Sequence, residues 1–217
     1  MANSGLQLLG YALGMCGWIA TIAATGLPQW RTSAYAGEVI ITAVSIYEGL
    51  FMSCASQSTG QIQCKIFDSL LALPTRVQIT RALMICSIVV GLSALGVSAV
   101  GMKCTRMGAD NKTRKNRFAI LGGVVFLVAG LLCLTGTSYY AAEIAREFYS
   151  PLTPVQARYE FGQALFVGWV GACLVLMGGA FLCCSCSSKP SGKKSRPRGP
   201  PRRGPPRSKG SGRTDYV

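Results

Sequence analysis

The chain has 217 residues, half of them hydrophobic, and a formal net charge of +14. That charge lies in residues 103–117 and 189–217, because the charges of all other residues sum to zero. Between the charged segments lie four runs without Asp, Glu, Lys or Arg, each long enough to cross a bilayer core as a helix. These runs exclude an ordinary soluble domain, since a soluble helix of this length needs a polar face. The runs are residues 1–30, 82–102, 118–142 and 161–188.

The first run has two possible interpretations. Residues 22–26 resemble the cleavage site of a signal peptide. We interpret the run as a retained span, because no Lys or Arg precedes it and it is longer than the usual signal core. Four crossings also bring both basic clusters to one side of the membrane. The predicted spans are about residues 7–27, 82–102, 118–141 and 162–184.

The basic clusters orient these spans. Lys and Arg in short segments near span ends mark the cytoplasmic side. The loop of about residues 103–117 and the C-terminal tail are therefore predicted to be cytoplasmic, and with four crossings the N-terminus is cytoplasmic too. The outer loops are then about residues 28–81 and 142–161.

The first outer loop is predicted to fold as an antiparallel sheet, because it contains β-branched and aromatic runs separated by Gly and Ser clusters. Cys54 and Cys64 are the cysteines of this loop, and in an oxidising compartment we expect them to form a disulfide between the third and fourth strands. Residues 68–73 predict a short helical turn with Asp68 as its N-cap. The expected strands are residues 29–35, 39–44, 46–54 and 61–67.

The spans themselves offer no chemistry. The chain has no His, and acidic or basic side chains are absent from mid-membrane positions. This excludes a proton relay, a voltage sensor or an intramembrane enzyme, so we expect no catalytic residue, cofactor or metal. The pair Gly10 and Gly14 instead predicts close helix packing. Function is therefore expected in the outer loops.

The second outer loop is unusually apolar for an exposed segment. Phe148, Tyr149 and Tyr159 accompany two prolines there. We interpret this loop as a contact surface. Interfacial anchoring of the aromatic rings is the alternative.

The tail at residues 187–217 is predicted to be disordered, because it is a low-complexity mixture of Pro, Gly, Ser, Lys and Arg. Each of its basic residues is attracted to anionic lipids by about 1 kcal/mol near the membrane surface. Binding of nucleic acid is a weaker interpretation of the same residues. A free apolar C-terminus on a flexible tether fits a PDZ domain. The predicted PDZ ligand is Asp215, Tyr216 and Val217.

Several cysteines lie at the predicted cytoplasmic ends of the spans. S-palmitoylation is the usual modification at such positions. An equally weighted alternative is that they are reduced thiols acting as small apolar side chains. The candidates are Cys104, Cys183, Cys184 and Cys186.

The first outer loop also carries a recognisable motif. The motif resembles the signature of the claudin family of tight-junction tetraspan proteins, with Phe51 where the family has Trp. Its residues are Trp30, then Gly49-Leu50-Phe51, then Cys54 and Cys64. Arg81, residues 157–162 and the terminal Tyr216-Val217 are further points of resemblance. The resemblance covers residues 1–186, and the tail departs from it.

This resemblance implies a membrane α+β fold. Four helices would form a left-handed transmembrane bundle beneath an extracellular antiparallel sheet formed mainly by the first outer loop, with a fifth strand from the second. It implies a structural and adhesion component of tight junctions at the plasma membrane, not an enzyme, that polymerises into strands and controls paracellular permeability. Its partners would be claudins in the same membrane and on the neighbouring cell, and PDZ-domain scaffold proteins. The alternative is a tetraspan auxiliary or adhesion subunit of the wider claudin-like superfamily that forms no strands.

The resemblance also implies roles for single residues. The position after the second cysteine, here Lys65, influences ion selectivity in the family. With Arg31 nearby and no acidic residue between Glu48 and Asp68, this predicts a barrier or a cation-excluding junction. The alternative is that Lys65 is only a solvated strand residue in a sealing claudin. By the same resemblance, Phe148, Tyr149 and Tyr159 are adhesion residues and Leu70 makes the side-by-side contact.

Overall fold

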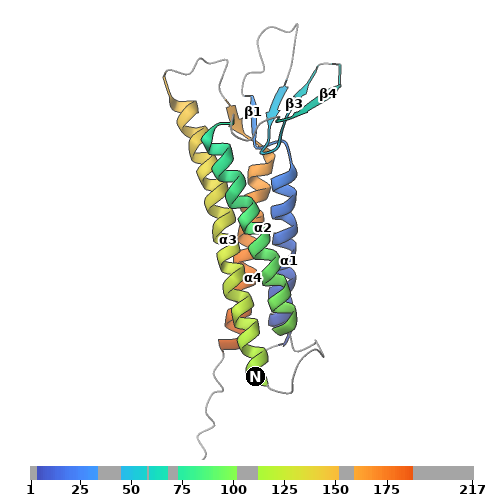
Figure 1. The fold of residues 1–217 in the computed structure, drawn as a ribbon, viewed down its shortest axis with the longest axis vertical. Helices are drawn as coiled ribbons and strands as arrows, with labels where there is room; N and C mark the ends of the chain where they lie inside the picture. The colour runs from blue at the N-terminus through green and yellow to red at the C-terminus, as the bar shows by residue number, and fades with distance from the viewer. Residues whose placement is uncertain are drawn as a thin grey trace, which may run out of the picture.

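The computed structural model describes four long helices that lie side by side (Figure 1). Each helix contains an apolar stretch long enough to cross a membrane. The described residues are 4–33, 45–57, 59–67, 73–101, 112–151 and 159–187. The helices are α1 (Ser4–Gly26), α2 (Thr75–Gly101), α3 (Lys112–Tyr149) and α4 (Gln163–Ser187).

Two helices extend beyond the predicted spans on the side of the sheet. α2 begins at Thr75, directly after Pro74, a residue that favours helix starts. α3 continues to Tyr149 and ends just before Pro151, because a proline disfavours helical geometry in the residue that precedes it. Residues 75–81 and 142–149, which the sequence analysis placed in the outer loops, are therefore helical.

Small residues determine how closely α1 and α4 pack. A Cβ atom added at Gly17 would lie 2.7 Å from the backbone nitrogen of Val175, and one added at Gly178 would lie 2.6 Å from the backbone nitrogen of Gly14. Neither backbone can move aside, so both positions need glycine. Both residues of the predicted pair lie at close helix contacts: a Cβ atom at Gly10 would meet the backbone oxygen of Gly178 on α4 at 3.0 Å, and one at Gly14 would meet the Phe126 ring on α3 at 3.0 Å.

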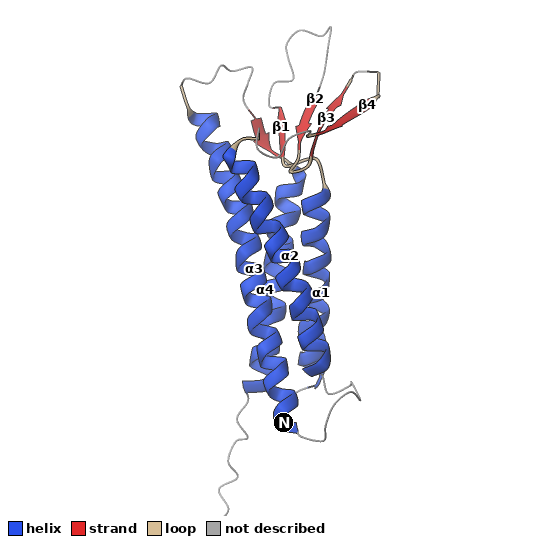
Figure 2. Cartoon of the chain, in the orientation of Figure 1, coloured by secondary structure: helices blue, strands red, loops and turns tan. Residues whose placement is uncertain are grey.

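A five-stranded antiparallel sheet lies at one end of the bundle (Figure 2). Its order is β4-β3-β2-β1-β5, so β5 from the second outer loop pairs with β1, as the resemblance implied. The Cys54–Cys64 disulfide joins β3 to β4, where the two residues are register partners. The strands are β1 (Arg31–Ser33), β2 (Ser45–Glu48), β3 (Met52–Ser56), β4 (Ile62–Ile66) and β5 (Tyr159–Phe161).

The prediction of one strand at residues 46–54 was wrong. The segment forms two antiparallel strands, and the Gly49 N–H closes the turn between them by donating to the Met52 carbonyl at 2.9 Å. A Cβ atom at Gly49 would lie 2.6 Å from the Cα of Pro28, so the chain reverses where it meets the end of α1. The strand predicted at residues 39–44 lies outside the described residues, and so does the turn predicted at residues 68–73 apart from its last residue.

Candidate functional site

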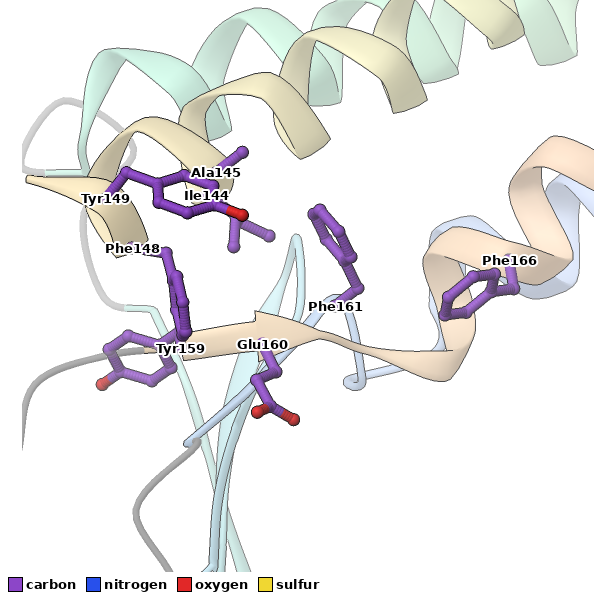
Figure 3. A pocket seen from close by; sticks show the side chains of 8 residues that line it. All are labelled: Ile144, Ala145, Phe148, Tyr149, Tyr159, Glu160, Phe161 and Phe166. Carbon is purple, nitrogen blue, oxygen red and sulfur yellow. The ribbon is translucent and has the colours of Figure 1, made fainter.

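An aromatic pocket lies between the outer end of α3, strand β5 and the start of α4 (Figure 3). Its volume is about 370 Å³. Phe148 extends from α3 toward Tyr159 on β5, while Glu160 points away from the rings. Tyr149 is 83% exposed at the tip of the helix. The pocket is lined by Ile144, Ala145, Phe148, Tyr149, Tyr159, Glu160, Phe161 and Phe166.

The structure brings together the three aromatic residues that the sequence predicted for the second outer loop. Phe148, Tyr149 and Tyr159 all line the pocket, and the first two rings pack edge to face at 5.6 Å. Sequence reasoning missed Ile144 and Phe166. Ile144 lies one helical turn before Phe148, so extending the predicted helix to Tyr149 would have found it.

Charged side chains form an ion-pair network behind this pocket, made of Arg31, Glu48, Glu147 and Arg76. The Arg31 Nε donates to Glu48 at 2.7 Å, and its Nη1 lies 3.5 Å from Glu147, which also pairs with Arg76. The side chains of Arg31 and Arg76 are 10% and 13% exposed. The network therefore connects β1, β2, α2 and α3.

The sequence analysis placed Arg31 among the selectivity residues, and the structure gives it a different position. Its guanidinium is nearly buried, carries two carboxylate partners, and stacks over the Tyr159 ring with Cζ 4.2 Å from the centroid. A cation held in this way contributes little field to the surrounding water, because Glu48 and Glu147 offset its charge. These contacts indicate a structural role for Arg31 in the sheet, and its role in ion selectivity stays a prediction.

Tyr159 completes this arrangement. Burial and the negative charge of Glu48 raise the pKa of the Tyr159 phenol above its ordinary value. The phenol therefore stays protonated at neutral pH and donates toward Glu48, with the two oxygens 3.5 Å apart. This contact attaches β5, one wall of the pocket, to the ion-pair network.

The signature residues join the sheet to the helices. Trp30 is fully buried, packs edge to face on Tyr140 at 5.2 Å, and its Nε1 donates to the Ala24 carbonyl at 2.8 Å. Leu50 is also fully buried, and its carbonyl accepts from Arg81 on α2. The Arg81 guanidinium lies 4.7 Å from the centre of the Phe51 ring. The motif is thus an anchor that holds the sheet on the bundle.

Comparison with known proteins agrees with this architecture. Residues 4–182 match the PMP-22/EMP/MP20/Claudin family. The chain is 59% identical to Claudin-19 of Mus musculus over 205 residues, which are 94% of this chain and 91% of the relative. It is 57% identical to Claudin-1 of Mus musculus over 189 residues, 87% and 90% of the two chains, and 54% identical to Claudin-7 of Rattus norvegicus over 191 residues, 88% and 90%. The chain belongs to the claudin family.

Family membership decides several sequence predictions. This claudin is a multi-pass membrane protein of tight junctions, with a structural role and not an enzymatic one, and it interacts with other claudins there. The identity to named claudins does not favour the alternative of an auxiliary subunit that forms no strands. Within the described residues, no group of His, Cys, Asp or Glu side chains could hold a metal ion.

Lys65, Cys183, Cys184 and Cys186 are not among the residues that line the pocket. Lys65 is exposed in the edge strand β4, opposite Ser53 on β3. Cys184 is exposed and Cys183 half-buried near the end of α4, which also contains Cys186. Leu70, Cys104 and the C-terminal Asp215, Tyr216 and Val217 lie outside the described residues.

Proposed function

We propose that this claudin forms a paracellular barrier that excludes cations, and that Lys65 supplies the repelling charge. The observation that carries the proposal is the position of Lys65 on the exposed strand β4. Register partners share a face of a sheet, so Lys65 shares a face with Ser53, and Ser53 with Glu48. Among the described residues of this row, Glu48 is the only one with a carboxylate, and it is bonded to Arg31, which offsets its charge. Lys65 adds a positive charge at an exposed position of this face, and such a charge beside a narrow pore is expected to repel cations.

The Lys65→Asp variant tests this proposal. Reversing the charge replaces repulsion of cations by attraction, and low-dielectric walls strengthen the effect. We expect the sodium-to-chloride permeability ratio, obtained from dilution potentials across an epithelial layer, to rise about fivefold, or about 1 kcal/mol. Lys65→Arg keeps the charge and is the matched control, with an unchanged ratio. Equal ratios for Lys65→Asp and the wild type would instead favour the sealing alternative, in which Lys65 is only a solvated residue.

We also propose that the aromatic pocket receives a neighbouring claudin during strand formation. Its lining is mostly aromatic, and the sequence around Leu70 is apolar enough to enter such a pocket from a second copy. Tyr149, the most exposed of the three aromatic residues, is suited to contacts beyond its own chain. Phe148 and Tyr159 shape the pocket walls, which an incoming side chain would meet.

The Tyr149→Ala variant tests the pocket. Because Tyr149 is 83% exposed, its truncation costs folding little, and the variant should reach the plasma membrane. Loss of an aromatic anchor is expected to weaken self-association about tenfold and to reduce the strands in freeze-fracture images. Tyr149→Phe keeps the ring and should form strands normally. Abundant strands made by Tyr149→Ala would argue against the proposal.

Both termini of this claudin are proposed to be cytoplasmic. The disulfide-bonded sheet lies at one end of the bundle, as expected for an oxidising compartment, and α4 runs away from the sheet toward the tail (Figure 1). On that side the basic tail would contact anionic lipids, and Asp215, Tyr216 and Val217 would bind a PDZ-domain scaffold protein.

Palmitoylation is proposed at the cysteines near the same end of the bundle. Cys183 and Cys184 lie near the end of α4, where this modification is usual, and Cys104 and Cys186 are proposed with them.

A further inference from the structure

The two walls of the aromatic pocket belong to segments that are far apart in the sequence. One wall is the last turn of α3, with Phe148 and Tyr149, and the other is β5, with Tyr159. The distance between the walls decides which side chain the pocket can accept. Whatever holds α3 against the sheet therefore sets the shape of the pocket.

Arg31 contacts both segments that form the walls. Its guanidinium lies 3.5 Å from the Glu147 carboxylate on α3 and stacks over the Tyr159 ring on β5, with Cζ 4.2 Å from the centroid. The same group is bonded to Glu48 on β2, which also lies 3.5 Å from the Tyr159 hydroxyl. A planar guanidinium presents its donors in a rigid fork, so these contacts fix direction as well as distance.

Glu147 holds the last turn of α3 in place. It directly precedes Phe148 and Tyr149, and its carboxylate pairs with both Arg31 on β1 and Arg76 on α2. The final turn of a helix leaves carbonyl groups without helical partners and frays unless it is attached. Two arginines from different elements provide that attachment within one turn of the aromatic side chains.

We propose that Arg31 and Glu147 are positioning residues, which hold the Phe148 and Tyr149 wall and the Tyr159 wall at the separation that admits a neighbouring claudin. This inference rests on the proposed role of the pocket in strand formation. It assigns these two charged residues to assembly, which they affect through the aromatic residues without touching the neighbouring copy.

The experiment measures self-association of the full-length protein in claudin-deficient cells, by energy transfer between tagged copies at matched surface density. Glu147→Gln keeps the size of the side chain and removes both ion pairs. Arg31→Lys keeps the charge and removes the fork, so a change cannot come from the electric field of a pore. Each variant is expected to reach the surface with its Cys54–Cys64 bridge formed and to self-associate about fivefold more weakly, which corresponds to about 1 kcal/mol.

Glu143→Gln is the matched control. It makes the same substitution one turn earlier on α3, where Glu143 pairs with the 77% exposed Arg146 of the same helix, and it should associate normally. Adding Tyr149→Ala to Glu147→Gln should weaken association less than the two separate effects combined, since both act through one pocket.

The outcomes separate the two proposals. Normal association of Tyr149→Ala would overturn the role of the pocket and this inference with it. Weak association of Tyr149→Ala together with normal association of Glu147→Gln or Arg31→Lys would overturn the inference alone. If Glu147→Gln is retained inside the cell, Arg31→Lys decides; if both are retained, the residues serve folding and the inference is wrong.

Discussion

The Trp30→Ala variant is expected to lose about 3–5 kcal/mol of folding free energy and to be retained inside the cell. Trp30 is the largest of the fully buried side chains in the described part of the chain. Its removal leaves a cavity beside Tyr140 at the junction of the sheet and the helices. The loss is large compared with the 5–15 kcal/mol that typically stabilises a folded protein.

The indole nitrogen adds a second effect. The Ala24 carbonyl lies in the last turn of α1, where carbonyl groups lack helical partners, and the Trp30 Nε1–H satisfies it at 2.8 Å. Trp30→Phe keeps most of the ring but leaves this carbonyl unsatisfied, so it should cost about 1–3 kcal/mol. Thermal unfolding of the detergent-purified proteins and their surface delivery measure both effects. A Trp30→Ala protein as stable as the wild type would contradict the anchoring role of the signature.

Replacing Cys54 and Cys64 together by serine is expected to cost about 2–5 kcal/mol. All five residues of β4 are exposed and its outer edge has no neighbouring strand in the described sheet, so β4 depends on its pairing with β3 and on the disulfide. The bridge closes a short loop, for which restriction of the unfolded chain alone contributes about 3 kcal/mol. Loss of β4 would also displace Lys65, so cation exclusion should fall with stability.

Reduction of the wild-type protein provides an independent test of the bridge. With reductant present, its thermal unfolding should resemble that of the double serine variant, whose own unfolding reductant should leave unchanged. Cys173→Ser, at an exposed position on α4, is the control and should unfold like the wild type. Identical unfolding of the wild type with and without reductant would show that β4 does not need the disulfide.

Much of the fold could be predicted because its causes are local. A charge-free run of about twenty residues has few alternatives to a transmembrane helix, and strand β4 and the disulfide follow from a short segment and its compartment. The ends of α2 and α3 could not be predicted in the same way. The length of an apolar run gives only the part of a helix that crosses the membrane. Beyond the membrane a helix can continue in water until a residue such as Pro151 ends it.

The division of residues 45–56 into two strands and the place of Arg31 required tertiary contacts. The turn at position 49 needs glycine because Pro28 leaves no room for a side chain. The periodicity of residues 45–56 does not show this contact, because Pro28 lies outside the segment. The partners of Arg31 are not evident from the sequence, because Glu48 lies on another strand and Glu147 is 116 residues away. Charge is a property of one residue, but its effect depends on what lies beside it.

The four apolar helices, the family signature and the aromatic residues of the second loop could be found without a structure, because apolar length and motif spacing are encoded along the chain. Which charged side chains form buried ion pairs, and which lie on an exposed strand, became clear only from the folded chain. Ion pairs form through space, so the contacts of Arg31 with Glu48 and Glu147 and the exposure of Lys65 on β4 are properties of the folded chain.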